Sequence, residues 1–384
     1  MEILFWSSII LVSYCYFGYP LLVALAARLC PHPVRKADYP ASVSFVLSVY
    51  NEADVLRAKL ENILSLQYPA GEVEILIGSD GSTDQTNEIV KGFTDTRLRF
   101  FPSTERRGKM ATINDLVAKA QNEIVIFTDA RQIFAPDAVV ELVKNFADPQ
   151  VGCVSGELMF TTQKGGGTAQ GINFYWTYEK FLRRREAHLH SMLGATGAIY
   201  AIRRTLYAPV PADVVLDDVY IPFKIIAAGY RAIFDEAALA YDEVADSPRE
   251  EHRRKARTLY GNYQIFALFP GFLNPLASPI AIQLFSHKFL RVVAPFLLIL
   301  ALGANALLVG QPAYTRFFLL QIVFYIMAMI GGLARHCKCG MLKGLLRLCY
   351  VPYVFCLLNF SALAGFLRFF RRQQRATWDK AREG

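Results

Sequence analysis

Long uninterrupted runs of apolar residues lie at both ends of this sequence, whereas shorter apolar runs alternate with polar positions through its middle. Residues 3–27 carry no charge and are long enough to cross a bilayer as a helix. The same holds for residues 292–315 and 348–367 and, only just, for 317–334. Residues 40–260 have the length and composition of an ordinary α/β domain. The pattern therefore predicts a folded domain flanked by transmembrane helices.

These runs also set the boundaries that we expect. An N-terminal transmembrane anchor covers residues 1–30, and we interpret it as retained because Glu2 precedes it where a signal peptide has basic residues. The folded domain covers 40–260. Segments at 261–287, interrupted by prolines, are expected to lie along the membrane interface. A transmembrane region of about three helices follows over 288–370, and a basic tail covers 371–384.

Within residues 40–260 the alternation predicts a doubly wound sheet. Apolar runs predict a first strand over 42–49, a second over 73–78 and a third over 98–101, with helices over 53–66 and after Asp84. Asp80 to Thr83 form the expected turn after the second strand, and Asp84 is placed to cap the next helix. This β-α-β-α-β unit should have right-handed crossovers. The further elements that we expect are helices near 110–120, 136–146, 175–190, 217–228 and 250–257, and strands near 124–127, 151–155, 198–202 and 231–234.

Composition and charge support a membrane protein. Hydrophobic residues make up 53% of the chain and its net charge is +8. The basic residues gather beside the apolar spans, which is typical of the cytoplasmic face of a membrane and makes a nucleic-acid-binding role unnecessary. The seven cysteines fall mostly in or near the apolar segments and suggest no disulfide framework. The short run from His336 to Cys339 is too isolated to predict a zinc site.

Acidic residues stand at the predicted ends of strands and starts of helices. Glu52, Asp80 and Asp129 follow three strands, and the pair Asp217 and Asp218 begins a helix. The carboxyl ends of parallel strands meet at one edge of a doubly wound sheet, where such sheets bind ligands. Each acid alone could be a turn or cap residue. Together they predict a binding cleft.

The order of these motifs resembles that of glycosyltransferase family 2 over roughly residues 40–260. The matching segments are Tyr50-Asn51-Glu52, Asp80-Gly81-Ser82-Thr83-Asp84, Arg107-Gly108-Lys109, Thr128-Asp129-Ala130 and Asp217-Asp218. The flanking membrane segments resemble those of the bacterial exopolysaccharide branch, which includes hyaluronan, poly-N-acetylglucosamine and cellulose synthases. The resemblance implies a GT-A fold, a nucleotide-diphosphate sugar donor, expected to be a UDP-sugar, and transfer of a hexosyl or N-acetylhexosaminyl group with inversion.

The resemblance also implies roles on the donor side. Tyr50, Glu52 and Asp80 match positions that hold the base and ribose, for which a carboxylate can accept hydrogen bonds from base N–H and ribose hydroxyl groups. Lys109 matches a donor-binding lysine. Asp129 matches the metal-binding aspartate, so we expect Mg²⁺ or Mn²⁺ bound between this carboxylate and the diphosphate.

On the acceptor side, Asp218 matches the general base, and Asp217 is expected to support it. Both could at the same time be N-terminal cap residues of their helix. The loop containing Gly194, Thr196 and Gly197 matches the acceptor-side loop, although a plain connecting turn fits the sequence nearly as well.

Two departures from the family pattern stand out. Arg131 occupies the position of a second metal-motif aspartate, which leaves Asp129 as the expected protein ligand. The processive synthases carry a Gln-x-x-Arg-Trp motif, whereas this chain has Glu251-His252-Arg253-Arg254-Lys255. Arg254 or Arg257 could reach the diphosphate or face the membrane. The missing Trp removes a stacking surface for the acceptor sugar and weakens the case for a processive enzyme.

We therefore expect a multi-pass protein of the inner membrane, with its catalytic domain on the cytoplasmic face. Its acceptor would be a growing polysaccharide or a lipid-linked precursor, with membrane lipids and polysaccharide-export proteins as candidate partners. The alternative is transfer of single sugars to a polyisoprenyl phosphate or membrane lipid. A non-enzymatic transport or scaffold protein is the third hypothesis. A hydride-transferring enzyme is disfavoured because no Gly-x-Gly-x-x-Gly follows the first strand.

The topology has one conflict that the sequence leaves open. Three full C-terminal spans would place the basic residues 368–382 outside, against the positive-inside rule. Either the last segment is re-entrant or the proline-rich stretch near 270–279 crosses the membrane.

Overall fold

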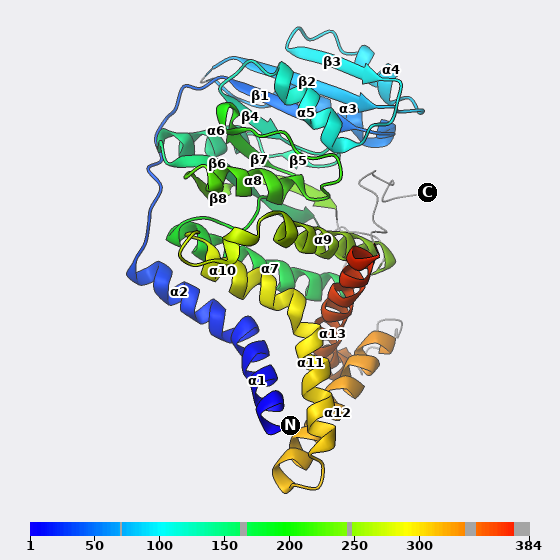
Figure 1. Cartoon of the computed structure of the whole chain (residues 1–384). Coiled ribbons are helices and arrows are strands. Elements are labelled where there is room, and N and C mark those ends of the chain that lie inside the picture. Colours follow the sequence, from blue (N-terminus) through cyan, green and yellow to red (C-terminus); the bar gives the residue numbers. More distant parts are fainter. Residues whose placement is uncertain (70, 162–166, 244–247, 335–342, 372–384) are drawn as a thin grey trace. The chain divides into compact units, whose positions relative to one another are not determined.

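The computed structural model describes residues 1–69, 71–161, 167–243, 248–334 and 343–371, without the side chains of 161–175, 248–255, 334 and 343–347 (Figure 1). The chain divides into two compact units. The sheet unit comprises the described residues of 29–161 and 183–244, and the helical unit those of 1–28, 162–182 and 245–374.

The sheet unit contains a mixed sheet of eight strands, in the order β3-β2-β1-β4-β7-β6-β8-β5 among the described residues (Figure 1). Its first half is parallel and consists of β1 (Val43–Val49), β2 (Val73–Asp80), β3 (Leu98–Ser103) and β4 (Ile124–Phe127). In its second half β7 (Tyr200–Arg203) runs antiparallel to β4 and to β6 (Val151–Thr161). Strand β8 (Arg231–Glu243) is parallel to β6, and β5 (Ile133–Phe134) pairs antiparallel with β8.

Helices connect and cover these strands. They are α3 (Ala53–Ser65), α4 (Thr86–Lys91), α5 (Lys109–Lys119), α6 (Ala138–Lys144) and α8 (Asp217–Ala227), with short 3₁₀ turns at Asn145–Ala147 and Arg204–Leu206. Helix α7 (Gly167–Leu189) has residues in both units. The β-α-β-α-β prediction is confirmed. Strands β1, β2 and β4 contain near-continuous apolar runs because both faces of the sheet are buried there, as the adjacent buried residues Phe45 and Val46 show.

Helix α5 packs closely on β2, because Gly78 leaves room for it. A Cβ atom at Gly78 would lie 2.4 Å from the γ-methyl of Thr112 and 3.2 Å from Leu116. The expectation that the second strand stops at Gly78 was wrong, since β2 continues to Asp80 by pairing with β3. Strands β6 and β8 are also longer than predicted because they pair with each other along most of their length. Strand β5 is too short to give a sequence pattern.

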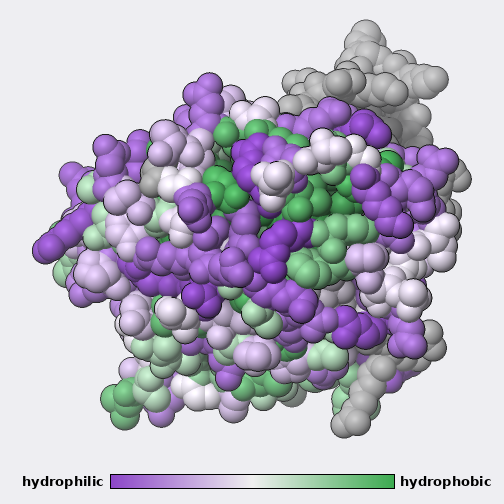
Figure 2. Space-filling view, turned by 90° about the horizontal axis from the view of Figure 1, so that it is seen from above, coloured by the Kyte–Doolittle hydropathy of each residue, from purple (hydrophilic) through white to green (hydrophobic). Residues whose placement is uncertain are grey.

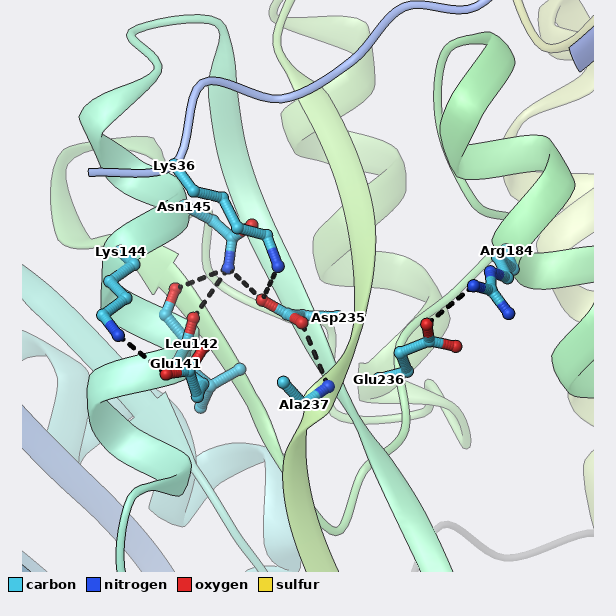
Figure 3. Close-up of polar contacts among 9 residues, drawn as sticks. All are labelled: Lys36, Glu141, Leu142, Lys144, Asn145, Arg184, Asp235, Glu236 and Ala237. Atoms are coloured by element: carbon cyan, nitrogen blue, oxygen red, sulfur yellow. Dashed lines mark hydrogen bonds and ion pairs between the residues drawn. The ribbon is translucent and has the colours of Figure 1, made fainter. Parts of the chain in front are cut away.

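The segment before β1, which contains Lys36, is hydrogen-bonded to the sheet unit through Asp235 (Figure 3). Asp235 on β8 is buried, and its carboxylate accepts hydrogen bonds from Lys36 Nζ at 2.8 Å and Asn145 Nδ2 at 2.6 Å. The N–H of Ala237 donates to the same carboxylate at 3.1 Å. The buried charge is thus met by one cation and two neutral donors, as a buried carboxylate requires. The face of this unit turned upward in Figure 1 is covered largely by hydrophilic side chains (Figure 2).

The helical unit begins with α1 (Glu2–Ser13), a π-helical turn at Tyr14–Gly18 and α2 (Tyr19–Leu29). Its later elements are α9 (Pro248–Leu268), a 3₁₀ turn at Pro270–Leu273, α10 (Ala281–Gln283), a second π-helical turn at Leu284–Phe289, α11 (Leu290–Leu307), α12 (Pro312–Ala334) and α13 (Lys343–Phe370).

Among the described residues, four stretches of helix are long and apolar enough to cross a membrane: Glu2–Leu29, Ala281–Leu307, Pro312–Leu333 and Leu348–Phe370. The second of these begins at Ala281, inside the segment predicted as interfacial, because α10, the π turn and α11 follow one another directly. Helix α13 continues past Pro352 without a break. Many of their large apolar side chains are exposed, as expected of surfaces that contact lipid.

Candidate active site

The turns after β1 and β2 are tied to each other at the carboxyl edge of the sheet. Asn51 follows β1 with φ of 53°, a left-handed conformation that asparagine tolerates better than most residues. Its side-chain oxygen accepts a hydrogen bond from the N–H of Thr83 at 2.8 Å, and its own N–H donates to Ser82 Oγ at 3.1 Å. Tyr50 and Glu52, on either side of Asn51, are thereby fixed beside the turn that follows Asp80.

Asp84 binds the beginnings of two helices. Its carboxylate accepts hydrogen bonds from the N–H of Thr86, the first residue of α4, at 3.0 Å and from the N–H of Ala53, the first residue of α3, at 3.2 Å. Negative charge at a helix N-terminus is favourable because unpaired N–H groups point there. Asp84 thus bonds the first N–H group of α4, although Gln85 and not Asp84 occupies the N-cap position, and it bonds the first N–H group of a second helix as well.

Asp80 holds the segment that leads into α5. Its buried carboxylate accepts hydrogen bonds from the N–H of Arg107 at 2.7 Å and from the N–H of Gly108 at 2.9 and 3.1 Å. The neighbouring Gly81 has φ of +71°, and a Cβ atom there would lie 2.9 Å from the backbone nitrogen of Arg106. Only glycine fits this crossing of two backbones. Lys109 is then the first residue of α5.

The ammonium group of Lys109 joins carboxylates from two distant segments. It lies 3.0 Å from Asp129 Oδ1 and 3.3 Å from Asp217 Oδ1, and all three side chains are largely buried. Burial alone would lower the pKa of Lys109. The charges of Asp129 and Asp217, with that of Asp218 further away, outweigh burial and hold this pKa well above its usual value. Lys109 is therefore a permanent cation at the centre of this cluster.

Asp218 lies beside the loop at 194–197. The N–H of Ala195 donates to the Asp218 carbonyl at 2.6 Å, and the N–H of Gly197 donates to its carboxylate Oδ2 at 3.2 Å. Gly194 has φ of +125°, so the turn at this position favours glycine. A Cβ atom at Gly197 would lie 3.3 Å from Asp218 Oδ2. The structure thus brings the predicted acceptor-side loop and the predicted base together.

Tyr50 and Glu52, which are predicted to contact the nucleotide base, lie at the same edge of the sheet. The guanidinium of Arg106 lies 3.9 Å from the ring centroid of Tyr50, a cation–π contact. The N–H of Glu52 donates to Thr86 Oγ1 at 2.9 Å. Both positions are partly exposed, as a ligand contact requires.

Arg254 and Arg257 lie on α9, in the helical unit. The side chain of Arg254 lies outside the described residues, and that of Arg257 is partly buried. Their contact with a diphosphate stays a prediction.

Three side chains of this region were not predicted from the sequence. Lys59 is fully buried under the Asp129 turn, and Tyr200 OH donates to Asp217 Oδ2 at 3.2 Å. Arg183 donates to Thr196 Oγ1 at 2.7 Å. For Lys59 a signal existed, because it stands three residues after Leu56 on the apolar face of its helix. The other two contacts join distant segments and leave no local pattern.

A divalent cation would find one matching carboxylate here. Among the residues that the structure covers, no cluster of three or more His, Cys, Asp or Glu side chains could hold a metal. Asp129 offers a hard oxygen ligand, and Mg²⁺ sites are commonly built from one or two carboxylates and the phosphates of a substrate. The residues present therefore fit a cation shared with a diphosphate rather than a cage made by the protein.

Comparison with known proteins agrees with this geometry. The chain is 24% identical over 299 residues to poly-beta-1,6-N-acetyl-D-glucosamine synthase of Staphylococcus aureus, covering 76% of this chain and 70% of that protein. It is 25% identical over 229 residues to the synthase of the same name from Staphylococcus epidermidis, covering 58% and 55%.

The solved structure of a mannosyltransferase from Pyrobaculum calidifontis, in complex with GDP-Man and Mn²⁺, superimposes with a TM-score of 0.72 at 25% identity. The similarity covers 96% of this chain and 99% of that one. This confirms the GT-A fold with its flanking apolar helices. Residues 44–209 match the family model described as Glycosyl transferase family 2.

Proposed function

We propose that this protein is an inverting glycosyltransferase that moves a sugar from a nucleotide-diphosphate donor, most simply a UDP-sugar, to a growing polysaccharide or its lipid-linked precursor. The observation that carries the proposal is the cluster of Lys109, Asp129 and Asp217, which stands next to Asp218 at the ligand-binding edge of the sheet. A donor-binding cation and a base are thus contributed by adjacent segments. The similarity to poly-N-acetylglucosamine synthases favours a hexosaminyl group.

Donor binding uses the turns after β1 and β2. Tyr50, Glu52 and Asp80 would contact the base and ribose, and Asp80 also keeps the Arg107–Gly108 backbone in place. Lys109 would neutralise charge on the diphosphate, because its own charge persists throughout the physiological pH range. Arg254 and Arg257 are proposed as further diphosphate contacts.

Proton removal is assigned to Asp218. Its carboxylate would accept the proton of the acceptor hydroxyl as that oxygen attacks the anomeric carbon from the side opposite the nucleotide, which inverts the configuration. The N–H of Gly197 orients this carboxylate. Asp217 points instead to Lys109 and Tyr200 and would support the site without touching the acceptor. Gly194, Thr196 and Gly197 would allow the acceptor sugar to approach the backbone.

Asp129 would hold Mg²⁺ or Mn²⁺ together with the donor diphosphate. When bound, the cation supplies positive charge that stabilises the departing nucleoside diphosphate. The Mn²⁺ and GDP-Man in the mannosyltransferase complex support this assignment.

The proposal is tested by Asp218→Asn in the purified full chain. Loss of a general base typically costs 10²–10⁴-fold in rate, so we expect about a thousandfold lower kcat with unchanged affinity for UDP. A variant with full activity would exclude Asp218 as the base. Mass spectrometry or NMR of the product would show whether the anomeric configuration is inverted.

A second candidate is the transfer of single sugars to a polyisoprenyl phosphate or a membrane lipid. It is favoured by the Glu251–Lys255 segment, which lacks the Gln and Trp of the processive motif. Product length separates the two, because a processive enzyme yields long chains at low conversion whereas single transfer yields one sugar per acceptor.

The four candidate spans indicate a membrane protein. We propose a multi-pass arrangement in the inner membrane, with the sheet unit on the cytoplasmic face where nucleotide sugars are available. Labelling of engineered cysteines in intact cells would test this placement.

A further inference from the structure

A lysine with no solvent exposure lies beneath the turn that carries Asp129. Lys59 is 0% exposed and stands on the buried face of α3 between Leu56 and Ile63. Burial lowers its pKa to about 7, against the opposing effect of the negative charge of Asp129. Placing an amine in an apolar core is unfavourable unless its N–H groups are hydrogen-bonded. The contacts of this amine therefore indicate what it does.

The Lys59 amine holds both ends of the Asp129 turn. Its Nζ donates to Thr128 Oγ1 at 2.8 Å and to the carbonyl oxygen of Gln132 at 2.6 Å. It also lies 4.2 Å from the ring centroid of Phe134. The two acceptors belong to the first and last residues of the segment 128–132, which contains Asp129. One side chain from α3 thus closes this turn from below.

Two further contacts extend this bracing. Asn62, one helical turn after Lys59, binds both backbone groups of Phe134, at 2.8 Å to its N–H and 3.0 Å to its carbonyl. The hydroxyl of Thr128 donates to the carbonyl of Ala198 at 2.9 Å, directly after the acceptor-side loop. The Asp129 turn is therefore fixed to α3 and to the segment that leads into β7.

These contacts matter because the predicted metal motif of this chain contains one carboxylate, where the family pattern has two. Arg131 stands where the family pattern has an aspartate, so the direction of the single Asp129 carboxylate decides how a cation is held. We propose that Lys59 is a positioning residue, which keeps the Asp129 turn in the conformation that binds the divalent cation with the donor diphosphate. This inference rests on the proposed function.

The test is Lys59→Met in the purified full chain, because methionine has a similar shape and no N–H donor. Binding of Mn²⁺ is followed by the electron paramagnetic resonance signal of the free ion, with UDP present, or GDP if the wild type prefers it. Residues that orient metal ligands typically contribute 10–100-fold to metal affinity. We expect the variant to need an Mn²⁺ concentration at least about tenfold higher than the wild type for half-saturation. Its affinity for the nucleotide in the absence of metal should stay within about twofold of the wild type.

Ile63→Ala is the matched control, since it removes a buried apolar side chain, which has no hydrogen bond to the turn, from the same helix one turn further along. It should lower the melting temperature and leave Mn²⁺ half-saturation unchanged. Thr128→Val removes the partner of Lys59 and should also weaken Mn²⁺ binding, whereas Thr128→Ser keeps the hydroxyl and should not. If Lys59→Met unfolds the protein, the two Thr128 variants carry the test.

The outcomes separate this inference from the proposed function. If the wild type shows neither nucleotide-dependent Mn²⁺ binding nor sugar transfer, the proposed function fails. If the wild type shows both, but Lys59→Met or Thr128→Val binds Mn²⁺ like Ile63→Ala, the positioning role of Lys59 is overturned. The double variant Lys59→Met/Thr128→Val should bind Mn²⁺ no more weakly than the weaker of the two single variants. This result would confirm that the two residues act through one contact.

Discussion

The proposed donor side and the proposed acceptor side of this site are built differently. On the donor side, Asp80 is buried and its carboxylate is bonded to the backbone N–H groups of Arg107 and Gly108. On the acceptor side, Asp218 is only partly buried, and its carboxylate lies against the N–H of Gly197. The donor side is thus preorganised, whereas the proposed base keeps a face accessible to an incoming hydroxyl. Variants on the two sides should therefore have separable effects.

Apart from removal of the proposed base by Asp218→Asn, the largest effect is expected for Lys109→Met, which removes the cation shared by the two sides. Asp129 and Asp217 would then be largely buried acids that have lost their shared cation, and the donor phosphates would lose a positive partner. Removing one preorganised electrostatic group typically costs 10²–10³-fold, so we expect about a hundredfold or greater loss of kcat/KM. Steady-state kinetics against Lys109→Arg, which keeps the charge, would check this. A loss of less than fivefold would contradict the central place of Lys109.

The next effect is expected for Asp80→Ala, which should break the donor side alone. It leaves the N–H groups of Arg107 and Gly108 without their acceptor, which we expect to cost about 2 kcal/mol and weaken UDP binding about thirtyfold. Calorimetry of UDP binding measures this. Asp95→Ala, which removes a partner of Arg97 near the surface, is the control and should leave binding unchanged. Equal losses in both variants would argue against a donor role for Asp80.

Gly197→Ala should perturb the acceptor side alone. The added methyl would lie 3.3 Å from Asp218 Oδ2, and the carboxylate must shift by a few tenths of an ångström. Because displacement by about 1 Å can cost a hundredfold in rate, we expect about a tenfold lower kcat with UDP affinity unchanged. Gly303→Ala, where the methyl meets no atom within 4 Å, is the control. If Gly197→Ala changed the affinity for UDP instead of kcat, the separation into a donor side and an acceptor side would be wrong.

The smallest effect is expected for Tyr200→Phe. It removes the hydroxyl that donates to Asp217, a contact expected to contribute about 1 kcal/mol and about fivefold in kcat. Kinetics and thermal unfolding of the same preparation would show whether the loss is catalytic or structural. A fall in melting temperature with kcat unchanged would assign Tyr200 to the fold only.

The parts of the fold that the sequence predicted share one property, which is local pattern. Strands such as β1 and β4 are buried on both faces, so their apolar runs mark them directly. The lengths of β6 and β8 depend on their pairing with each other, far apart in the chain, and no window of residues records that. The two residues of β5 are held by β8 and by Asn62 rather than by their own preference.

The same reasoning applies to the site. Asp80, Asp129 and Asp217 could be located because each stands at a predictable strand end or helix start. Asp80 and Asp129 meet at one edge because each follows a parallel strand, which makes their approach predictable. Asp217 instead begins α8 after the antiparallel strand β7, so its contact with Lys109 could not be predicted in this way. The position of Lys59 on the apolar face of its helix indicates burial, but its contacts could not be predicted, because its partners are a hydroxyl and a carbonyl about seventy residues away whose direction only the folded turn sets.

The double contact of Asp84 has a consequence for affinity. One carboxylate fastens the first residues of α3 and α4, and Asn51 joins the loops beside them. A nucleotide arriving at this surface would meet groups already immobilised, so little of its interaction energy would be spent on ordering the protein. The entropy that the protein loses when a nucleoside diphosphate binds at this surface should accordingly be small.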